Sequence, residues 1–143
     1  MKIKLNCVLL VDDNDSDNFI HKRVLEKSAV ASNIAVAMNG KEALDFLTTK
    51  GSCGQTDDSY SQPELIFLDI NMPIMDGWEF LEEYHRLDVG QKGKIVFIML
   101  TTSLNPVDKI KAEKLLENGC FHFKPLTLQM INDIIRQHFP EYL

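Results

Sequence analysis

Short apolar runs that each end in polar or turn-forming residues constrain the fold of this chain most. Four such runs span residues 8–11, 65–68, 95–100 and 120–123. Apolar runs of this length, bounded by turn residues, are typical of buried strands in a parallel sheet. The residues that end them are acidic, hydroxyl-bearing or basic: Asp12-Asp13, Asp69, Thr101-Thr102 and Lys124. Because ligands bind outside the carboxyl ends of the strands in open parallel sheets, we expect these side chains to meet at one edge.

Strand patterns alternate with helix patterns five times along the chain. The expected strands are residues 5–11, 34–38, a run ending at Asp69, a run ending at Thr101, and 120–123. Helix starts are expected with Ser16 as an N-cap, near Gly40 and Gly77, at Asn105-Pro106, and with Thr127 as an N-cap. This alternation predicts an α/β fold in which five strands and five helices are joined by right-handed crossovers. The strand that ends at Asp69 would be central, and the last strand, which alternates in polarity, would lie at an edge.

The size and charge of the chain exclude several classes of protein. Its 143 residues, 45% of them hydrophobic, are expected to form a single domain, 1–143, with a substantial core. The formal charge of −6 argues against a nucleic-acid surface, so we expect no direct DNA binding. No apolar run approaches a membrane span, and the first one is too short for a signal peptide. We therefore expect a cytoplasmic protein without a membrane contact.

Other features carry no expected chemistry. The segment at about 48–62 is rich in Gly, Ser, Thr and Asp and is expected to be a long loop. The three cysteines, Cys7, Cys53 and Cys120, form no CxxC pair and are expected to be reduced. The four histidines show no metal spacing and are expected at the surface or half-buried.

The acidic residues at the strand ends predict a site for a divalent cation. Mg²⁺ prefers hard oxygen ligands and usually keeps several waters. Asp13 and Asp69 would supply direct carboxylate ligands, Asp12 would hold a coordinated water, and Asn71 would supply its backbone carbonyl. Two carboxylates about 4 Å apart repel by roughly 4 kcal/mol at an effective dielectric constant of 20. Three of them need a cation, because Lys124 alone contributes one positive charge.

The same set of residues is suited to phosphoryl transfer. That reaction needs an in-line nucleophile, a metal and positive groups on the equatorial oxygens, and a carboxylate can be the nucleophile. Asp69 would be the acceptor, while Thr101 would donate to one phosphoryl oxygen and Lys124 would pair with another. Each residue alone has an ordinary explanation, since an Asp at a strand end most often caps a helix or forms a turn. The joint pattern, at four of the five expected strands, is what favours the reaction.

Several longer motifs resemble one family over nearly the whole chain. They are VLLVDDN at 8–14, NGKEAL at 39–44, LIFLDINMPIMDGWEFL at 65–81, MLTTS at 99–103 and FKP at 123–125. The sequence is similar to the receiver domains of response regulators in two-component signalling, of the stand-alone, chemotaxis-regulator-like type. This resemblance implies a flavodoxin-like α/β fold: a doubly wound, five-stranded parallel sheet in the order 2-1-3-4-5, with five helices. It also implies a protein that is no conventional enzyme but catalyses its own Asp phosphorylation and dephosphorylation, as a phosphorelay component.

The resemblance assigns roles to individual residues. It implies that Asp69 takes a phosphoryl group from a phosphohistidine, and that Asp12, Asp13, Asp69 and the Asn71 carbonyl bind Mg²⁺ or Mn²⁺. The implied phosphoryl-binding residues are Thr101, Thr102 and Lys124. Thr101 and Phe121 would form the switch, with Phe121 at a position where many family members have Tyr.

The resemblance also implies partners. They are a histidine kinase or His phosphotransfer protein, a downstream protein target, and a second copy of the chain in a phosphorylation-dependent homodimer.

Three other functions compete with this one. A dehalogenase-type phosphatase would use Asp13 in the segment Asp13–Ser16, but Ser replaces the usual Thr and Asp69 would have no role. A flavodoxin-like cofactor binder needs hydroxyls and glycines in its first loop, where this chain has carboxylates that repel a phosphate. A receiver-like protein that works without phosphorylation would not need the complete residue set.

Overall fold

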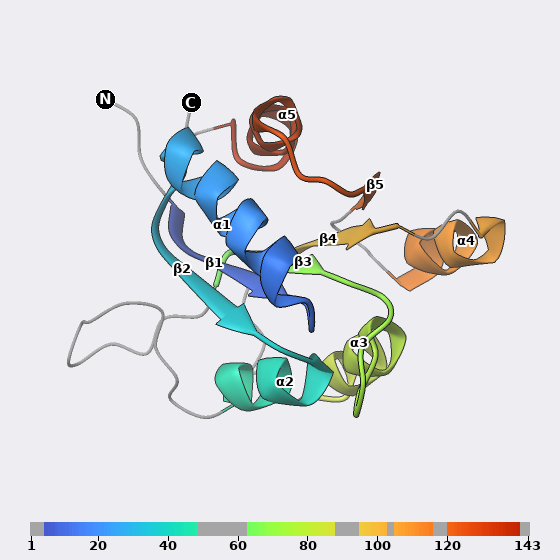
Figure 1. The fold of residues 1–143 in the computed structure, drawn as a ribbon. Coiled ribbons are helices and arrows are strands. Elements are labelled where there is room, and N and C mark those ends of the chain that lie inside the picture. Colours follow the sequence, from blue (N-terminus) through green and yellow to red (C-terminus); the bar gives the residue numbers. More distant parts are fainter. Residues whose placement is uncertain (1–4, 49–62, 88–94, 103–104, 116–119, 141–143) are drawn as a thin grey trace.

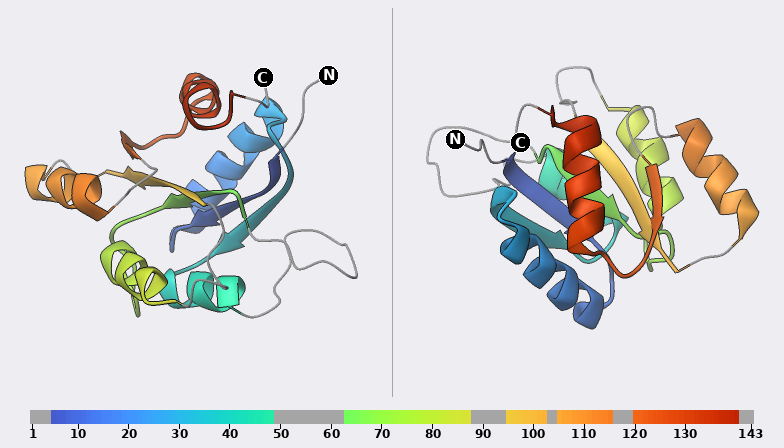
Figure 2. Two further views of the ribbon diagram at one scale, coloured as in Figure 1. Left: turned by 180° about the vertical axis from the view of Figure 1, so that it is seen from behind. Right: turned by 90° about the horizontal axis from the view of Figure 1, so that it is seen from above.

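The described residues of the computed structural model, 5–48, 63–87, 95–102, 105–115 and 120–140, form a parallel sheet covered by helices on both faces (Figures 1 and 2). The strands are β1 (Leu5–Val11), β2 (Ala31–Ala37), β3 (Leu65–Leu68), β4 (Val96–Thr101) and β5 (Cys120–Phe123). The helices are α1 (Asp15–Ser28), α2 (Gly40–Thr48), α3 (Gly77–His85), α4 (Pro106–Leu115) and α5 (Leu128–His138). The strand order is β2-β1-β3-β4-β5, which confirms the predicted doubly wound sheet.

The central strands are buried on both faces because successive side chains point to opposite sides of a strand. On β1, Leu9 packs into the core under α2 and α3, while Val8 and Leu10 pack into the core under α1 and α5. Figure 1 shows α1 and α5 on one side of the sheet and α2 and α3 on the other, so one core lies on each face of the sheet. Packing of helices on both faces holds the paired strands β1 and β3 side by side. It therefore also positions the carboxylates that follow these two strands.

Capping residues decide where the helices begin. The prediction of Ser16 as the first N-cap is wrong: α1 is capped by Asn14, whose Oδ1 accepts a hydrogen bond from the Asp17 amide at 3.0 Å. The Asn side chain is an equally good cap and lies closer to the strand, so the helix starts two residues earlier. Thr127 caps α5 as predicted, and its Oγ1 accepts from the Met130 amide at 3.1 Å.

Two further expectations need correction, and one lies mostly outside the described residues. Strand β2 spans Ala31–Ala37 rather than 34–38, because it pairs with β1 from Leu5 onward. Cys7 is disulfide-bonded, so the expectation of reduced thiols is wrong for this residue. Cysteine spacing without a recognised motif carries no information about such a pairing. Of the expected loop at 48–62, Thr48 ends α2 and the remainder is outside the described residues.

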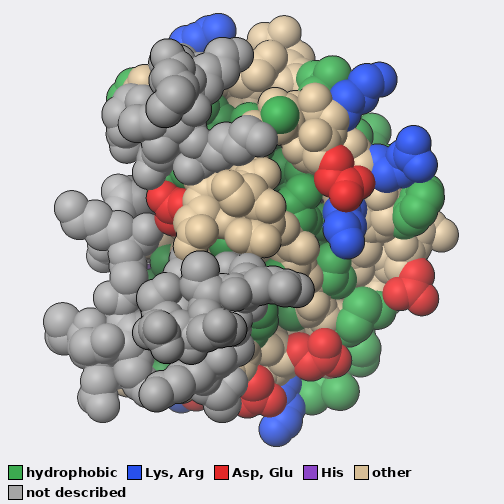
Figure 3. All heavy atoms as spheres, turned by 90° about the vertical axis from the view of Figure 1, so that its left-hand side faces the viewer, with side chains coloured by type: hydrophobic (Ala, Val, Ile, Leu, Met, Phe, Trp, Pro, Cys, Tyr) green, Lys and Arg blue, Asp and Glu red, His purple; other side chains and the backbone are tan. Residues whose placement is uncertain are grey.

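Helix length and surface charge bear on the expectations about membranes and charged partners. Within the described ranges, no helix has the length and apolar character needed to cross a bilayer. On the face shown in Figure 3, acidic and basic side chains are interspersed among hydrophobic ones.

Candidate functional site

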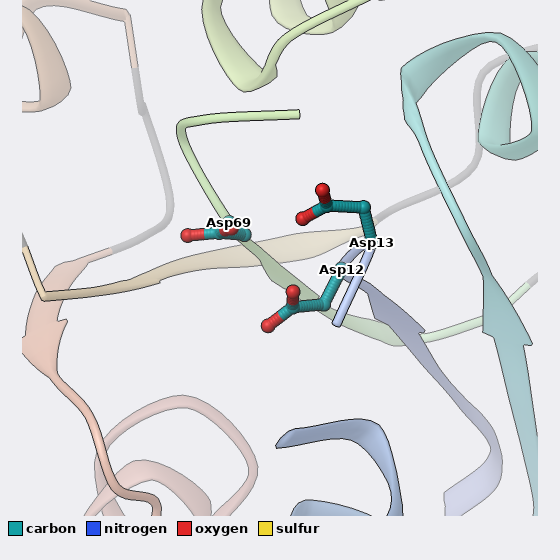
Figure 4. Close-up of side chains that lie close together, drawn as sticks. All are labelled: Asp12, Asp13 and Asp69. Carbon is teal, nitrogen blue, oxygen red and sulfur yellow. The ribbon is translucent and has the colours of Figure 1, made fainter. Parts of the chain in front are cut away.

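Three carboxylates converge at the carboxyl ends of β1 and β3. Oxygen atoms of Asp12, Asp13 and Asp69 all lie within 4.8 Å of one another (Figure 4). The sheet brings them together: the Asp12 amide donates to the Ala37 carbonyl at 3.0 Å, and the Asp69 amide donates to the Val11 carbonyl at 2.9 Å. Asp12 and Asp69 are buried and Asp13 is exposed, so the cluster opens toward solvent on the Asp13 side.

Lys124 enters this cluster from the end of β5. Its Nζ lies 2.6 Å from Asp12 Oδ2 and 3.7 Å from Asp69 Oδ1. The backbone holds the lysine next to β4, because its amide donates to the Thr101 carbonyl at 2.8 Å. The structure thus brings together four of the predicted site residues, Asp12, Asp13, Asp69 and Lys124.

Asp17 is a member of the site that sequence reasoning missed. Its Oδ2 lies 2.8 Å from Lys124 Nζ, although Asp17 follows no strand and sits in the first turn of α1. A side chain three residues after a capping Asn faces back toward the loop before the helix. This spacing is the sequence signal that would have indicated Asp17 as a member of the site. The helix dipole also favours an Asp in a first helical turn, so the presence of Asp17 there does not by itself indicate a contact with the lysine.

Burial and neighbouring negative charge disfavour ionisation of the Asp69 carboxyl group. Burial raises its pKa, and the neighbouring charge of Asp12 adds to that effect, so that the pKa reaches about 6 despite the opposing charge of Lys124. Burial lowers the pKa of Lys124, but hydrogen bonds to Asp12 and Asp17 oppose this more strongly, and the net shift is upward. The lysine is therefore charged, and a single positive charge is too little for the carboxylates around it.

Two buried polar residues of α1 lie next to the loop that contains Asp12. Asn18 donates from Nδ2 to the Asp12 backbone carbonyl at 2.8 Å, while its buried Oδ1 has no hydrogen-bond partner among the described residues. His21 is 3% exposed, against the expectation for the histidines, and burial followed by the charge of Lys124 lowers its pKa. Asn18, His21, Asp12 and Asp69 line a cavity that leaves ≈ 10 Å³ for the centre of a water molecule.

The turn between β3 and α3 is built around close backbone contacts. The Gly77 amide donates to the Ile70 carbonyl at 2.8 Å, and a Cβ at residue 77 would collide with the backbone carbonyl oxygen of Asp69. Asp76 then caps α3, with a capping box to Glu79. Within the turn, Ile74 has a φ of 67° and is 76% exposed, an unusual conformation for a β-branched residue. This turn fixes the orientation of Asp69.

The remaining predicted site residues lie around the cluster. Thr101 is buried at the end of β4, and Thr102 is exposed just beyond it. Asn71 is exposed in the turn after β3. Phe121 on β5 is half-buried, packs against the core under α2 and α3, and contacts the Phe123 ring edge-on with centroids 5.5 Å apart. The roles assigned to these four residues stay predictions.

Comparison with known proteins identifies a family that shares these features. The family model "Response regulator receiver domain" matches residues 8–136. Response regulator Rcp1 of Synechocystis sp. is 31% identical over 122 residues, which cover 85% of this chain and 78% of Rcp1. A two component response regulator structure from Cytophaga hutchinsonii is similar with a TM-score of 0.81 and 28% identity, over 97% of this chain and 100% of that one. The phosphorylated cyanobacterial phytochrome response regulator RcpA is similar with a TM-score of 0.69 and 30% identity, over 91% of this chain and 89% of that one.

Proposed function

Because the chain belongs to the family of response regulator receiver domains of two-component signalling, we propose that Asp69 accepts a phosphoryl group from a phosphohistidine. The observation that carries this proposal is the convergence of Asp69 with two further carboxylates and the Lys124 ammonium group. One Asp69 oxygen attacks phosphorus as the bond to the histidine nitrogen breaks, which leaves an aspartyl phosphate and a neutral imidazole after protonation. The donor is a histidine kinase or a His phosphotransfer protein.

The donor set at the site fits a divalent cation such as Mg²⁺ or Mn²⁺. Asp12, Asp13 and Asp69 present carboxylate oxygens within 4.8 Å of one another, and hard cations prefer oxygen ligands. Asn71 would add its backbone carbonyl. When bound, the cation supplies positive charge to the carboxylates and to the incoming phosphoryl oxygens. Asp13 is exposed, so the ion can enter and keep several of its waters.

The residues around Asp69 then hold the transferred group and report its presence. Lys124 pairs with one phosphoryl oxygen, and the hydroxyls of Thr101 and Thr102 donate to others. The movement of Thr101 leaves space that Phe121 fills, and a changed surface at α4, β5 and α5 passes the signal to a protein target or a second copy of the chain. The same residues orient a water for hydrolysis of the aspartyl phosphate. We place these events in the cytoplasm.

Intact mass after exposure to a small phosphodonor tests the proposal. With Mg²⁺ and acetyl phosphate, the wild-type protein should gain one phosphoryl group and the Asp69→Asn variant none. Asp15→Asn, a change at an exposed carboxylate on α1, should label like wild type. Borohydride trapping then locates the modified residue. Equal labelling of the Asp69→Asn variant, or trapping at Asp13, would move the nucleophile to Asp13 as in the phosphatase alternative.

A further inference from the structure

Asp17 holds the site lysine although it belongs to neither the sheet edge nor the three-carboxylate cluster. Its Oδ2 lies 2.8 Å from Lys124 Nζ, nearly as close as Asp12 Oδ2 at 2.6 Å. Asp69 Oδ1 lies 3.7 Å from the same Nζ, which is beyond hydrogen-bond distance. Lys124 therefore hydrogen-bonds to Asp12 and Asp17, and Asp69 receives the longer, weaker ion pair.

The start of α1 fixes the position from which Asp17 makes this contact. The Asp17 amide donates to Asn14 Oδ1 at 3.0 Å, so its backbone is held by the helix cap. A carboxylate in the first turn of a helix is favoured by the helix dipole. The Asp17 side chain is 33% exposed and the Lys124 side chain is 10% exposed, so the carboxylate reaches the lysine from the surface side of the site.

We propose that Asp17 is a positioning residue that withdraws Lys124 from Asp69 in the unphosphorylated protein. This inference rests on the proposed function of Asp69. A lysine has one positive charge, and here it is shared among three carboxylates. Contact with Asp17 therefore comes at the expense of contact with Asp69, which leaves the Asp69 carboxylate available to a cation and a phosphodonor.

The same contact opposes the phosphorylated state. A phosphoryl group brings the charge at residue 69 to about −2, so Lys124 gains more from approaching it than from approaching the bare carboxylate. Asp17 competes with that approach for as long as it holds the ammonium group. Removing the Asp17 charge should therefore favour the phosphoryl-bound state more than the resting state.

Binding of beryllofluoride, a phosphoryl mimic, tests this inference at saturating Mg²⁺. The Asp17→Asn variant should bind it about three- to five-fold more tightly than the Asp15→Asn variant, the range that a partly exposed ion pair supports. Asp15→Asn is the matched control because it removes the same charge from the same helical turn. Asp15 is exposed and is not one of the three carboxylates paired with Lys124. The Asn side chain has the shape of Asp and leaves the Asp17 amide on its cap.

A double-mutant cycle shows whether the effect passes through Lys124. In a Lys124→Gln background, Asp17→Asn should bind beryllofluoride no more tightly than Asp15→Asn. The inference is wrong if the two variants agree in the wild-type background, or if their difference persists without the lysine. Either result leaves the proposed function standing. If wild type itself binds no beryllofluoride, the proposed function fails instead.

Discussion

Asp69 is a carboxylate that the fold holds where its negative charge is disfavoured. Burial and the charge of Asp12 raise its pKa from 3.8 to about 6, and Lys124, at 3.7 Å, only partly offsets them. The difference between the two pKa values corresponds to roughly 3 kcal/mol of folding free energy. Electrostatic destabilisation of this kind is expected at a functional site, because a bound cation or a changed charge at Asp69 can relieve it.

The Asp69→Asn variant should therefore be more stable than wild type in metal-free buffer. The folded state binds the Asp69 proton more tightly than the unfolded state. Below about pH 3.8 both states are protonated, so Asp69 does not lower the free energy of unfolding there. As pH rises through about 6, the cost grows to its full value. Urea unfolding with a chelator should show an advantage of roughly 3 kcal/mol for the variant at neutral pH, which shrinks as pH falls toward 4. A pH-independent difference would contradict the raised pKa.

At the scale of single residues, the sequence predicted the members of the site that end strands. Asp12, Asp13, Asp69 and Lys124 were identified because a parallel sheet brings its strand ends to one edge, and the structure places them together. Asp17 and Asn18 were missed. Both lie on α1, where the rotation of the helix decides which side chains face the site. That rotation depends on where the helix is capped. The N-cap is Asn14, whereas the sequence predicts Ser16.

At the scale of elements, the turn that joins β3 to α3 couples helix packing to the position of Asp69. Gly77 begins α3 where a Cβ would collide with the Asp69 carbonyl oxygen, and its amide donates to the Ile70 carbonyl. The sequence predicted a helix near Gly77 from its apolar periodicity. It did not predict the need for glycine there, which comes from the close approach of two backbones rather than from a positive φ.

A Cβ at residue 77 should disturb the site more than it disturbs the fold. Gly77→Ala must push the Asp69 carbonyl aside, and overpacking of this kind costs about 1–3 kcal/mol. Because a small misplacement of a reacting group slows a reaction strongly, phosphorylation by acetyl phosphate should be at least about ten-fold slower. The measurements are urea unfolding and the rate of phosphoryl gain by intact mass.

The Ile134→Val variant provides the control for this prediction. Ile134 is buried on α5 in the core under α1 and α5, and its truncation should cost about 0.5–1.5 kcal/mol. Its phosphorylation rate should match wild type, since it leaves the turn unchanged. A Gly77→Ala variant that reacts as fast as Ile134→Val would mean that the turn does not position Asp69.

At the scale of the whole molecule, the sheet order decides which loops can cooperate. The order β2-β1-β3-β4-β5 places the acidic loop, Asp69, Thr101 and Lys124 on adjacent strands. The alternation of strands and helices predicted the α/β fold, while the strand order followed from the family resemblance, so fold and site geometry were predictable together. The disulfide at Cys7 was not, because it depends on contacts that no sequence motif encodes.

Cation binding should stabilise the whole domain, since three clustered carboxylates face one lysine. Mg²⁺ at 100 times its dissociation constant should add about 2.7 kcal/mol to the unfolding free energy. For a domain of this size that is a rise in melting temperature of roughly 5–10 °C. Asp13→Ala should melt higher than wild type without metal and lose most of the response. Identical melting curves in chelator and in Mg²⁺ would exclude a cation site.

Phosphorylation should change the surface formed by α4, β5 and α5 only if Thr101 transmits the change. Thr101 is buried at the end of β4, and its carbonyl accepts a hydrogen bond from the Lys124 amide at 2.8 Å, so the two residues link the ends of β4 and β5. A phosphoryl group shifts the population of two states only as far as its contacts differ between them. Phe121 is already half-buried against the core, so a small inward turn needs no hydroxyl partner.

The Thr101→Ala variant separates phosphoryl acceptance from signalling. It should still gain one phosphoryl group at Asp69, since the nucleophile and the carboxylate cluster are unchanged. Beryllofluoride should perturb NMR shifts through residues 109–114 and 121–135 in wild type, and these perturbations should shrink in the variant while those near Asp12 and Asp69 remain. Perturbations confined to the acidic loop and Asp69 in wild type would mean that partners read the phosphorylated edge directly, because the surface at α4, β5 and α5 would then be unchanged by phosphorylation.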